Sequence, residues 1–225
     1  QALKNPQDWQ KRQAFVRQKL QEAVGAFPEK TPLNPVITGK IERNGITVEK
    51  FYFESMPNYY VTAALFLPAR ERKNLPAIVF CSGHGATAFR SSVYQQMILN
   101  YVQKGFAVLA FDPIGQGERI QYAKTNEPKR FGNLKPTLEH SYPGAQSFVA
   151  GVSPAMYFIW DGIRAVDYLL TRPEIDAKRI GITGRSGGGT QSAYIAATDS
   201  RIAAAAPECY LTTYDKLLKS NGPQD

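Results

Sequence analysis

The chain has 225 residues, of which 43% are hydrophobic and 12% aromatic, a composition that predicts one folded domain over residues 1–225 and excludes a disordered chain. The formal net charge is +8, but the basic residues are scattered over separate segments and form no run rich in lysine and arginine. We therefore expect a solvated basic surface and no nucleic-acid partner. No apolar run approaches the ~20 residues that a helix needs to cross a bilayer, so no membrane span is expected.

The two cysteines, Cys81 and Cys209, are too few for a disulfide framework and lack the spacing of metal ligands. Both fall at the expected ends of buried strands, so we expect packed thiols, with a bridge as the alternative in a secreted protein. The sequence predicts neither a metal nor another cofactor. It begins at Gln1, which we interpret as a sign that a preceding segment has been removed, and we favour a periplasmic or secreted protein.

An amphipathic helix is predicted over residues 7–25. Its apolar residues recur at steps of four and seven, and a glycine after them provides a stop signal. These residues are Trp9, Val16, Leu20 and Val24, followed by Gly25.

Three antiparallel strands are expected next, over residues 36–67. Apolar and polar residues alternate there in three runs, as they do in half-buried strands. The runs are 36–41, 47–54 and 59–67. Asn44-Gly45 lies between the first two runs and is typical of a two-residue hairpin turn.

From residue 75 to residue 215 strands and helices alternate, which predicts a mostly parallel sheet with right-handed crossovers and helices on both faces. The predicted strands are 75–81, 106–111, 179–183 and 202–207. The predicted helices are 92–104, one that begins at Ser153-Pro154 and ends at Arg172-Pro173, and 190–197. The expected core faces are Val93, Met97 and Tyr101 on the first helix, and Ile159, Ile163, Val166 and Leu170 on the second.

Residues 118–152 interrupt this alternation, because Lys, Pro, Asn, Gly and Tyr are frequent there and no clear period emerges. A loop of this length within a compact domain is usually functional. We therefore expect a lid or a wall of the site. His140 belongs to this insertion, and we expect it at the surface or in the lid.

The last predicted strand is apolar on both faces and ends the visible sheet. An exposed apolar edge strand invites pairing with another chain, and proteins avoid such edges. We therefore expect one or more further strands after Asp225.

The most informative motif is Gly184-Arg185-Ser186-Gly187-Gly188, which lies between a predicted strand and a predicted helix. The order of strand, G-x-S-x-G and helix resembles the nucleophile elbow of the α/β-hydrolase fold, whose sharp turn exposes the serine Oγ. An elbow residue adopts a strained backbone, so its neighbours must carry little or no side chain. We predict Ser186 as a nucleophile; the alternative is a serine that caps a helix after a glycine turn.

Two loops are candidates for stabilising an oxyanion. In this fold the loop after the first core strand donates one backbone N–H, and the residue after the nucleophile donates the other. We assign these donors to the Gly85–Ala86 region and to Gly187. His84 is expected to shape the site, with a displaced catalytic base as the alternative.

Two carboxylates lie at predicted strand ends. Asp112 is the first residue of the run Asp112-Pro113-Ile114-Gly115-Gln116-Gly117-Glu118. We interpret it as a turn-forming aspartate before Pro and Gly, and the alternative is the acid of a catalytic triad. Glu208 follows the last predicted strand and is a second candidate acid, or else a strand-end residue paired with a base. Enzymes of this fold place acid and histidine after the serine, and no histidine follows Ser186. We expect the acid and the histidine beyond Asp225.

The segment from Pro173 to Gly189 resembles α/β-hydrolases of the acetyl xylan esterase and dienelactone hydrolase type. The run from Asp112 to Glu118 is similar to the glycine-glutamine-glycine segment of the acetyl xylan esterase/cephalosporin-C deacetylase family. The similarity covers about residues 47–215. It implies hydrolysis of small esters, often acetyl groups on sugars, without a cofactor.

The leading hypothesis is a serine carboxylic ester hydrolase that deacylates a carbohydrate ester through an acyl-enzyme on Ser186. The alternative enzyme is a serine peptidase of the prolyl-oligopeptidase type, whose hydrolase domain shares the elbow. The alternative of another class is a binding module without catalysis, because a serine without a base has little nucleophilicity at neutral pH. The sequence leaves the oligomeric state open.

Overall fold

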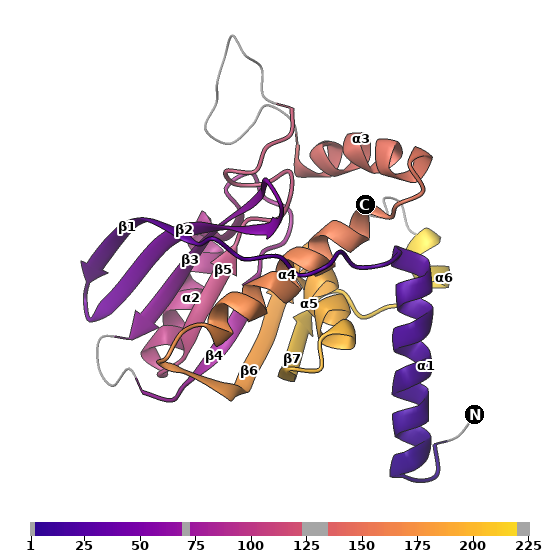
Figure 1. The fold of residues 1–225 in the computed structure, drawn as a ribbon, viewed down its shortest axis with the longest axis horizontal. Coiled ribbons are helices and arrows are strands. Elements are labelled where there is room, and N and C mark those ends of the chain that lie inside the picture. The colour runs from indigo at the N-terminus through magenta and orange to yellow at the C-terminus, as the bar shows by residue number, and fades with distance from the viewer. Residues whose placement is uncertain (1–2, 69–72, 123–134, 220–225) are drawn as a thin grey trace.

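The computed structural model describes residues 3–68, 73–122 and 135–219. A mixed sheet lies at its centre, with the strand order β1-β2-β3-β5-β4-β6-β7 (Figure 1). The strands are β1 Val36–Arg43, β2 Ile46–Met56, β3 Tyr59–Pro68, β4 Leu75–Cys81, β5 Ala107–Phe111, β6 Ile175–Arg185 and β7 Ile202–Glu208. Strands β1 to β3 and the β3–β5 pair are antiparallel, whereas β5, β4, β6 and β7 run parallel. The predicted antiparallel strands at the start of the sheet and the parallel strands after them are confirmed.

Helices cover both faces of this sheet (Figure 1). They are α1 Pro6–Val24, the 3-10 helix η1 Ala88–Arg90, α2 Ser92–Gln103, α3 Pro136–Val149, α4 Pro154–Leu170, α5 Gly187–Thr198 and α6 Tyr214–Leu218. Helices α4 and α5 bury their apolar residues in one cluster, and α2 buries its own in another on the opposite face. Because successive side chains of a strand point to opposite faces, Val79 belongs to the first cluster and its neighbour Phe80 to the second.

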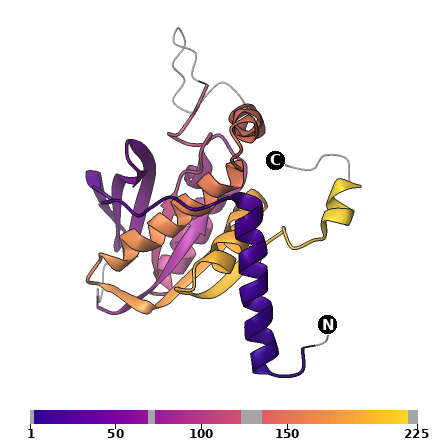
Figure 2. The same cartoon turned by 45° about the vertical axis from the view of Figure 1, so that its right-hand side comes forward.

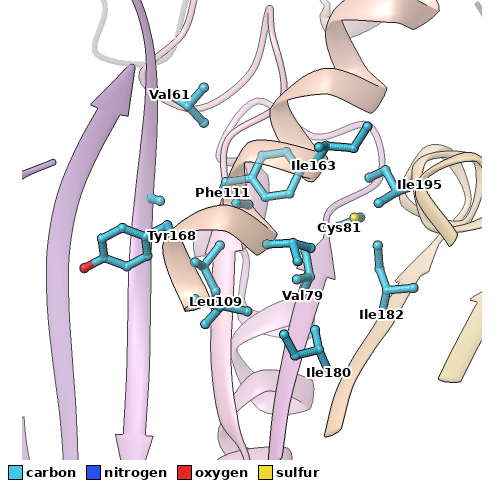
Figure 3. Packing of buried hydrophobic residues seen from close by; sticks show 14 of the residues in the cluster. Val61, Val79, Cys81, Leu109, Phe111, Ile163, Tyr168, Ile180, Ile182 and Ile195 are labelled. Atoms are coloured by element: carbon cyan, nitrogen blue, oxygen red, sulfur yellow. The ribbon is translucent and has the colours of Figure 1, made fainter. Parts of the chain in front are cut away.

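The larger cluster joins the sheet to α4 and α5 (Figure 3). Val79, Leu109 and Ile182 come from three adjacent parallel strands and face Ile163 of α4 and Ile195 of α5. This packing fixes the end of β6 and the start of α5, between which Ser186 lies.

The predicted apolar faces of the helices are only partly correct. Trp9 on α1 is 52% exposed, because this helix packs against α4 and α5 near its C-terminal end, and its N-terminal part points away from the sheet (Figure 2). On α2, Val93 is 53% exposed, whereas Met97 and Tyr101 pack as predicted against the cluster to which Ile98 and Val102 belong. On α4, Leu170 is 39% exposed, so the core face includes its neighbour Leu169 instead.

The insertion at residues 118–152 contains the helix α3, which the sequence analysis did not predict. Pro143 stands inside this helix and, like Gly144, argues against a helix in a sequence pattern. The helix also exposes Phe148 and Val149, so its apolar residues show no single buried face. Residues 123–134 of the insertion lie outside the described residues.

Strand β7 pairs with β6, and no other described strand pairs with it. Its alanines, residues 203–206, are exposed, so the expected apolar edge is present. The expectation of strands after Asp225 stays a prediction. Cys81 is buried, which raises the pKa of its thiol to about 12, whereas Cys209 is exposed and is not the packed thiol that was predicted. Over the described residues, no helix is both long and apolar enough for a membrane span.

Candidate active site

Ser186 occupies a sharp turn between β6 and α5. Its backbone has φ 59° and ψ −121°, a conformation that costs a residue with a side chain about 1–3 kcal/mol. The turn is held from both sides, since the Ser186 N–H donates to the Glu208 carbonyl at 2.9 Å and the Thr190 N–H donates to the Ser186 carbonyl at 3.0 Å. The arrangement of strand, strained serine and helix is that of a nucleophile elbow.

Glycines allow the elbow to approach β4 closely. A Cβ atom on Gly184 would lie 2.3 Å from the Cys81 carbonyl oxygen, and one on Gly188 would lie 2.1 Å from the same atom. Any side chain at either position would therefore separate β4 from the elbow. The strain of the turn predicts small residues beside Ser186, and the close approach of β4 is a second reason for them.

The loop after β4 lies against the elbow. A Cβ atom on Gly83 would lie 2.5 Å from the Arg185 carbonyl oxygen and 3.4 Å from the Ser186 Cβ. The His84 ring lies against Gly187, where a Cβ atom would be 2.7 Å from the His84 Cε1. The predicted loop is thus beside the predicted nucleophile, with Gly83 and His84 as its nearest residues.

The carbonyl groups of Gly83, Gly85 and Ala86 turn to the loop after β5. The Nε2 of Gln116, which is 1% exposed, donates to the Gly83 carbonyl at 2.9 Å and to the Gly85 carbonyl at 3.1 Å. The Gly117 N–H donates to the Ala86 carbonyl at 3.1 Å. In a trans peptide the C=O and N–H groups point in opposite directions, so the N–H groups of His84 and Ala86 point away from Gln116. Nothing in the sequence pattern indicated this role of Gln116.

Asp112 is fully buried and hydrogen-bonded within its own surroundings. Its carboxylate accepts from Arg90 Nη1 at 2.6 and 2.9 Å, from Thr62 Oγ1 at 2.7 Å and from the Glu118 N–H at 3.2 Å. Burial raises the pKa of Asp112 above its ordinary value, although Arg90 acts in the opposite direction. These contacts fit the turn interpretation of Asp112, and β4 separates its strand from that of Ser186.

Glu208 lies beside Ser186 through its main chain. Its carbonyl oxygen accepts the Ser186 N–H, and a Cβ atom on Gly189 would lie 2.4 Å from the same oxygen. Its side chain is half-buried at the end of β7. Glu208 therefore has the position that the sequence predicted, and its role as an acid stays a prediction.

The two histidines of the chain lie together beside the elbow. The ring centroids of His84 and His140 are 5.1 Å apart, and the His140 Nε2 donates to the Ile114 carbonyl at 2.8 Å. His140 is 6% exposed, so the expectation of a surface position was wrong. It is buried because α3 packs its inner face on the loop after β5, where a Cβ atom on Gly115 would lie 3.0 Å from the His140 Cδ2.

A buried ion pair fixes the same loop to α4. Arg119 Nη1 lies 2.7 Å from Asp161 Oδ2, and the two side chains are only 5% and 1% exposed. The same Nη1 donates to the Asp112 carbonyl at 3.0 Å. Nothing in the sequence pattern indicated this pair. Over the described residues, no cluster of three or more histidine, cysteine, aspartate or glutamate side chains is arranged to hold a metal ion.

Three known proteins illustrate what this chain is similar to. YtaP of Bacillus subtilis (strain 168), whose name assigns it to the hydrolases, is 23% identical over 214 residues, which are 91% of this chain and 66% of YtaP. The methylesterase BT1017 superposes with a TM-score of 0.71 at 25% identity, covering 91% of this chain and 42% of BT1017. BF1801 of Bacteroides fragilis NCTC 9343 superposes with a TM-score of 0.74 at 21% identity, covering 90% of this chain and 54% of BF1801.

This chain therefore spans between 42% and 66% of the length of these three proteins. The two structural superpositions support the α/β-hydrolase fold that the elbow indicates. The acetyl xylan esterase family matches residues 4–222, which is nearly the whole of the printed sequence. The chain belongs to the acetyl xylan esterase family, in agreement with the resemblance found in its motifs.

Proposed function

We propose that this chain carries the nucleophile of a serine carboxylic ester hydrolase that deacylates carbohydrate esters. The observation that carries the proposal is the strained backbone of Ser186, at φ 59° between β6 and α5, in a member of the acetyl xylan esterase family. A strained serine at a strand-to-helix turn projects its hydroxyl out of the sheet, where an ester can reach it.

The proposed reaction proceeds in two steps. Ser186 Oγ attacks the ester carbonyl, its proton passes to a general base, and the alcohol leaves with a proton as the acyl-enzyme forms. Water then attacks the acyl-enzyme and releases the carboxylic acid and Ser186. The Gly187 N–H, at the N-terminus of α5, and a main-chain N–H of the loop at residues 83–86 stabilise the oxyanion. The candidate oxyanion donors of this loop are the N–H groups of the Gly85–Ala86 region and of His84.

The general base and the acid remain to be assigned. We propose that a segment after Asp225 supplies the histidine, with Glu208 as the candidate acid within this chain. Asp112 is a weaker candidate, because its carboxylate already accepts four hydrogen bonds. His84 as a displaced base is the remaining alternative.

We also propose a periplasmic or secreted location, which fractionation of the native cells would test.

A serine-directed fluorophosphonate tests the proposal on the full-length protein. We expect mass spectrometry to find the label on Ser186, and Ser186→Ala to abolish it. Ser192→Ala is the matched control, since Ser192 lies on the same helix but is buried and donates to the Gly188 carbonyl at 2.7 Å. A protein that takes no label would favour a binding module without catalysis.

The substrate class is tested by turnover assays on the full-length protein without the label. We expect acetylated xylan oligosaccharides to be deacetylated, and the name of BT1017, a methylesterase, makes methyl esters the second class to assay. Turnover of peptidyl substrates without turnover of either ester would favour a peptidase of the prolyl-oligopeptidase type.

A further inference from the structure

We propose that a cleft beside the candidate active site binds an uncharged ring of an extended ester substrate of Ser186. The ring presents an apolar face, as an aryl group does and as the C–H face of a pyranose does. This inference rests on the proposed function, because it names the part of the ester substrate that the cleft holds.

The cleft has a volume of about 530 Å³, within the range of small-molecule sites. Its lining residues come mostly from α3, the first turns of α4 and the turn that joins β2 to β3. Its principal lining residues are Met56, Tyr59, Ile114, Gly144, Tyr157 and Phe158. The space is larger than an acetyl group requires, so a further part of the substrate has room in it.

The lining determines which ligand chemistry fits. The rings of Tyr59 and Tyr157 are 5.9 Å apart, and Phe158 adds a third aromatic face. Among the described residues, the lining includes no aspartate, glutamate, lysine or arginine. Arg119 lies 5.1 Å from the centre of the Tyr59 ring, but it is already paired with Asp161. A charged group would therefore lose its water here without gaining a counter-charge, which is costly. Aromatic faces and the apolar faces of rings pack well together, so an uncharged ring fits.

The cleft is separated from Ser186 by two histidine rings that are in contact with each other. His140 lines the cleft, and its ring contacts Phe158 at a centroid distance of 5.0 Å and His84 at 5.1 Å. His84 in turn lies against Gly187, the residue after Ser186. Two imidazole rings therefore connect the elbow to the cleft. A substrate that extends from its ester past these two rings places a ring in this cleft.

Binding is measured by ligand-observed NMR on full-length protein that carries Ser186→Ala, with phenyl β-D-xylopyranoside as the neutral probe. Tyr157→Ala removes an aromatic face from the cleft. Gly144→Leu fills the cleft, and its Cβ is tolerated because it would lie 3.5 Å from the Pro154 Cγ, an ordinary contact. Tyr142→Ala is the matched control, since Tyr142 lies on α3 with Gly144 but is 49% exposed and its ring packs against that of Tyr122.

We expect Tyr157→Ala and Gly144→Leu each to weaken binding of the probe about tenfold, and Tyr142→Ala to leave it unchanged. Benzoate, a charged ring, should bind at least about tenfold more weakly than the probe. Competition by methyl β-D-xylopyranoside identifies the pyranose as the bound ring, and competition by phenol identifies the aryl group. Thermal unfolding verifies that each variant is folded.

Unchanged affinity in both cleft variants would overturn the inference, and so would benzoate binding as tightly as the probe. This outcome is separate from the test of the proposed function, because binding to the Ser186→Ala protein requires no chemistry. If Ser186 takes no fluorophosphonate label but the cleft binds, the esterase proposal fails and the cleft remains a ring-binding site. If Ser186 is labelled and the cleft does not bind, only this inference fails.

Discussion

At the scale of single residues, Gln116 connects the two loops on which the site depends. Its Nε2 donates to the carbonyl groups of Gly83 and Gly85, and so fixes the orientation of both peptide planes. The N–H groups of those planes belong to His84 and Ala86, which include the candidate oxyanion donors. We therefore assign Gln116 the part of a positioning residue, which acts through the main chain of its neighbours.

Gln116→Leu keeps the side-chain size and removes the Nε2 donor, so the Gly83 and Gly85 carbonyl groups each lose the hydrogen bond from this side chain. We expect kcat to fall about 10- to 100-fold with little change in KM, because a misaligned oxyanion donor affects the transition state and not substrate binding. Steady-state kinetics on an acetyl ester provides the measurement. Gln95→Leu is the matched control, since the Gln95 Nε2 donates to the Phe89 carbonyl at 2.8 Å, outside this loop. Equal values of kcat in the two variants would contradict the assignment.

The strained backbone of Ser186 makes a second prediction at this scale. Ser186→Gly and Ser186→Ala both remove the hydroxyl, but only glycine adopts φ 59° and ψ −121° without strain. We expect Ser186→Gly to have a free energy of unfolding about 1 kcal/mol higher than Ser186→Ala, after allowing for the greater entropy of glycine in the unfolded chain. Urea denaturation compares them. An alanine variant as stable as the glycine variant would mean that the turn relaxes.

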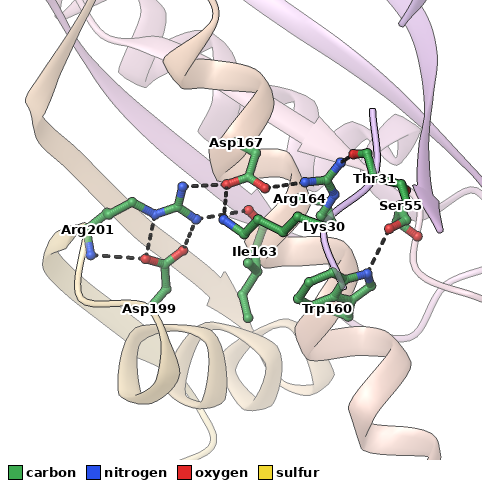
Figure 4. Close-up of polar contacts among 9 residues, drawn as sticks. All are labelled: Lys30, Thr31, Ser55, Trp160, Ile163, Arg164, Asp167, Asp199 and Arg201. Atoms are coloured by element: carbon green, nitrogen blue, oxygen red, sulfur yellow. Dashed lines mark hydrogen bonds and ion pairs between the residues drawn. The ribbon is translucent and has the colours of Figure 1, made fainter. Parts of the chain in front are cut away.

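At the scale of secondary-structure elements, α4 connects the site to the rest of the molecule. Toward the site, Asp161 binds Arg119 of the loop after β5. Toward the opposite end, Asp167 binds Arg164, Arg201 and Lys30, and joins α4 to the start of β7 and to the segment before β1 (Figure 4). A displacement of this helix would therefore reach the loop that holds Gln116.

Asp161→Asn removes the counter-charge of a buried arginine. We expect the free energy of unfolding to fall by about 3–5 kcal/mol, because Arg119 would remain buried with an uncompensated charge. Chemical denaturation measures the loss. Glu22→Gln, which breaks the exposed pair with Lys19, should cost less than about 1 kcal/mol. Similar losses in the two variants would contradict the importance of the buried pair.

Asp167 predicts a dependence of stability on pH. Burial alone would raise the pKa of this carboxyl, but the hydrogen bonds from Lys30 and Arg201 outweigh it and hold the pKa below its ordinary value. A carboxyl whose pKa is lowered by folding stabilises the protein above the ordinary aspartate pKa, near 4, and this contribution is lost as the pH falls through the lowered pKa. Denaturation at pH 6 and pH 3 should therefore show a smaller acid-induced loss in Asp167→Asn than in the parent protein. An equal loss in both proteins would contradict this.

The sequence predicted those elements whose signals are local. The strand before Ser186, the glycines around it and the Ser153-Pro154 helix start were all readable, because each depends on neighbouring residues. Helix α3 was missed because Pro143 interrupts its pattern and its apolar residues do not form one face. The contacts of Gln116 with Gly83 could not be predicted, since they join residues 33 positions apart and depend on how two loops meet.

At the scale of the whole molecule, the two edges of the sheet differ in their protection. The edge strand β1 carries charged side chains, including Lys40, Glu42 and Arg43, and its register shifts between Ile37 and Gly39. Charges and irregularities of this kind discourage pairing with another chain. The edge strand β7 carries no charge over its four consecutive exposed alanines, and its pairing with β6 is irregular at Ala203. Its free edge is therefore the surface of the described fold best suited to strand pairing.

A polypeptide of the printed 225 residues, studied by itself, should therefore self-associate through β7. We expect its mass in size-exclusion chromatography with light scattering to rise with protein concentration. Ala204→Lys places a charge on the free edge and should shift the mass toward the 25.0 kDa monomer. Ile41→Lys is the matched control, because Ile41 is 48% exposed on the opposite edge, which is already charged, and there the change should have little effect. A monomer at every concentration, or an effect of Ile41→Lys as large as that of Ala204→Lys, would show that β7 does not direct the association.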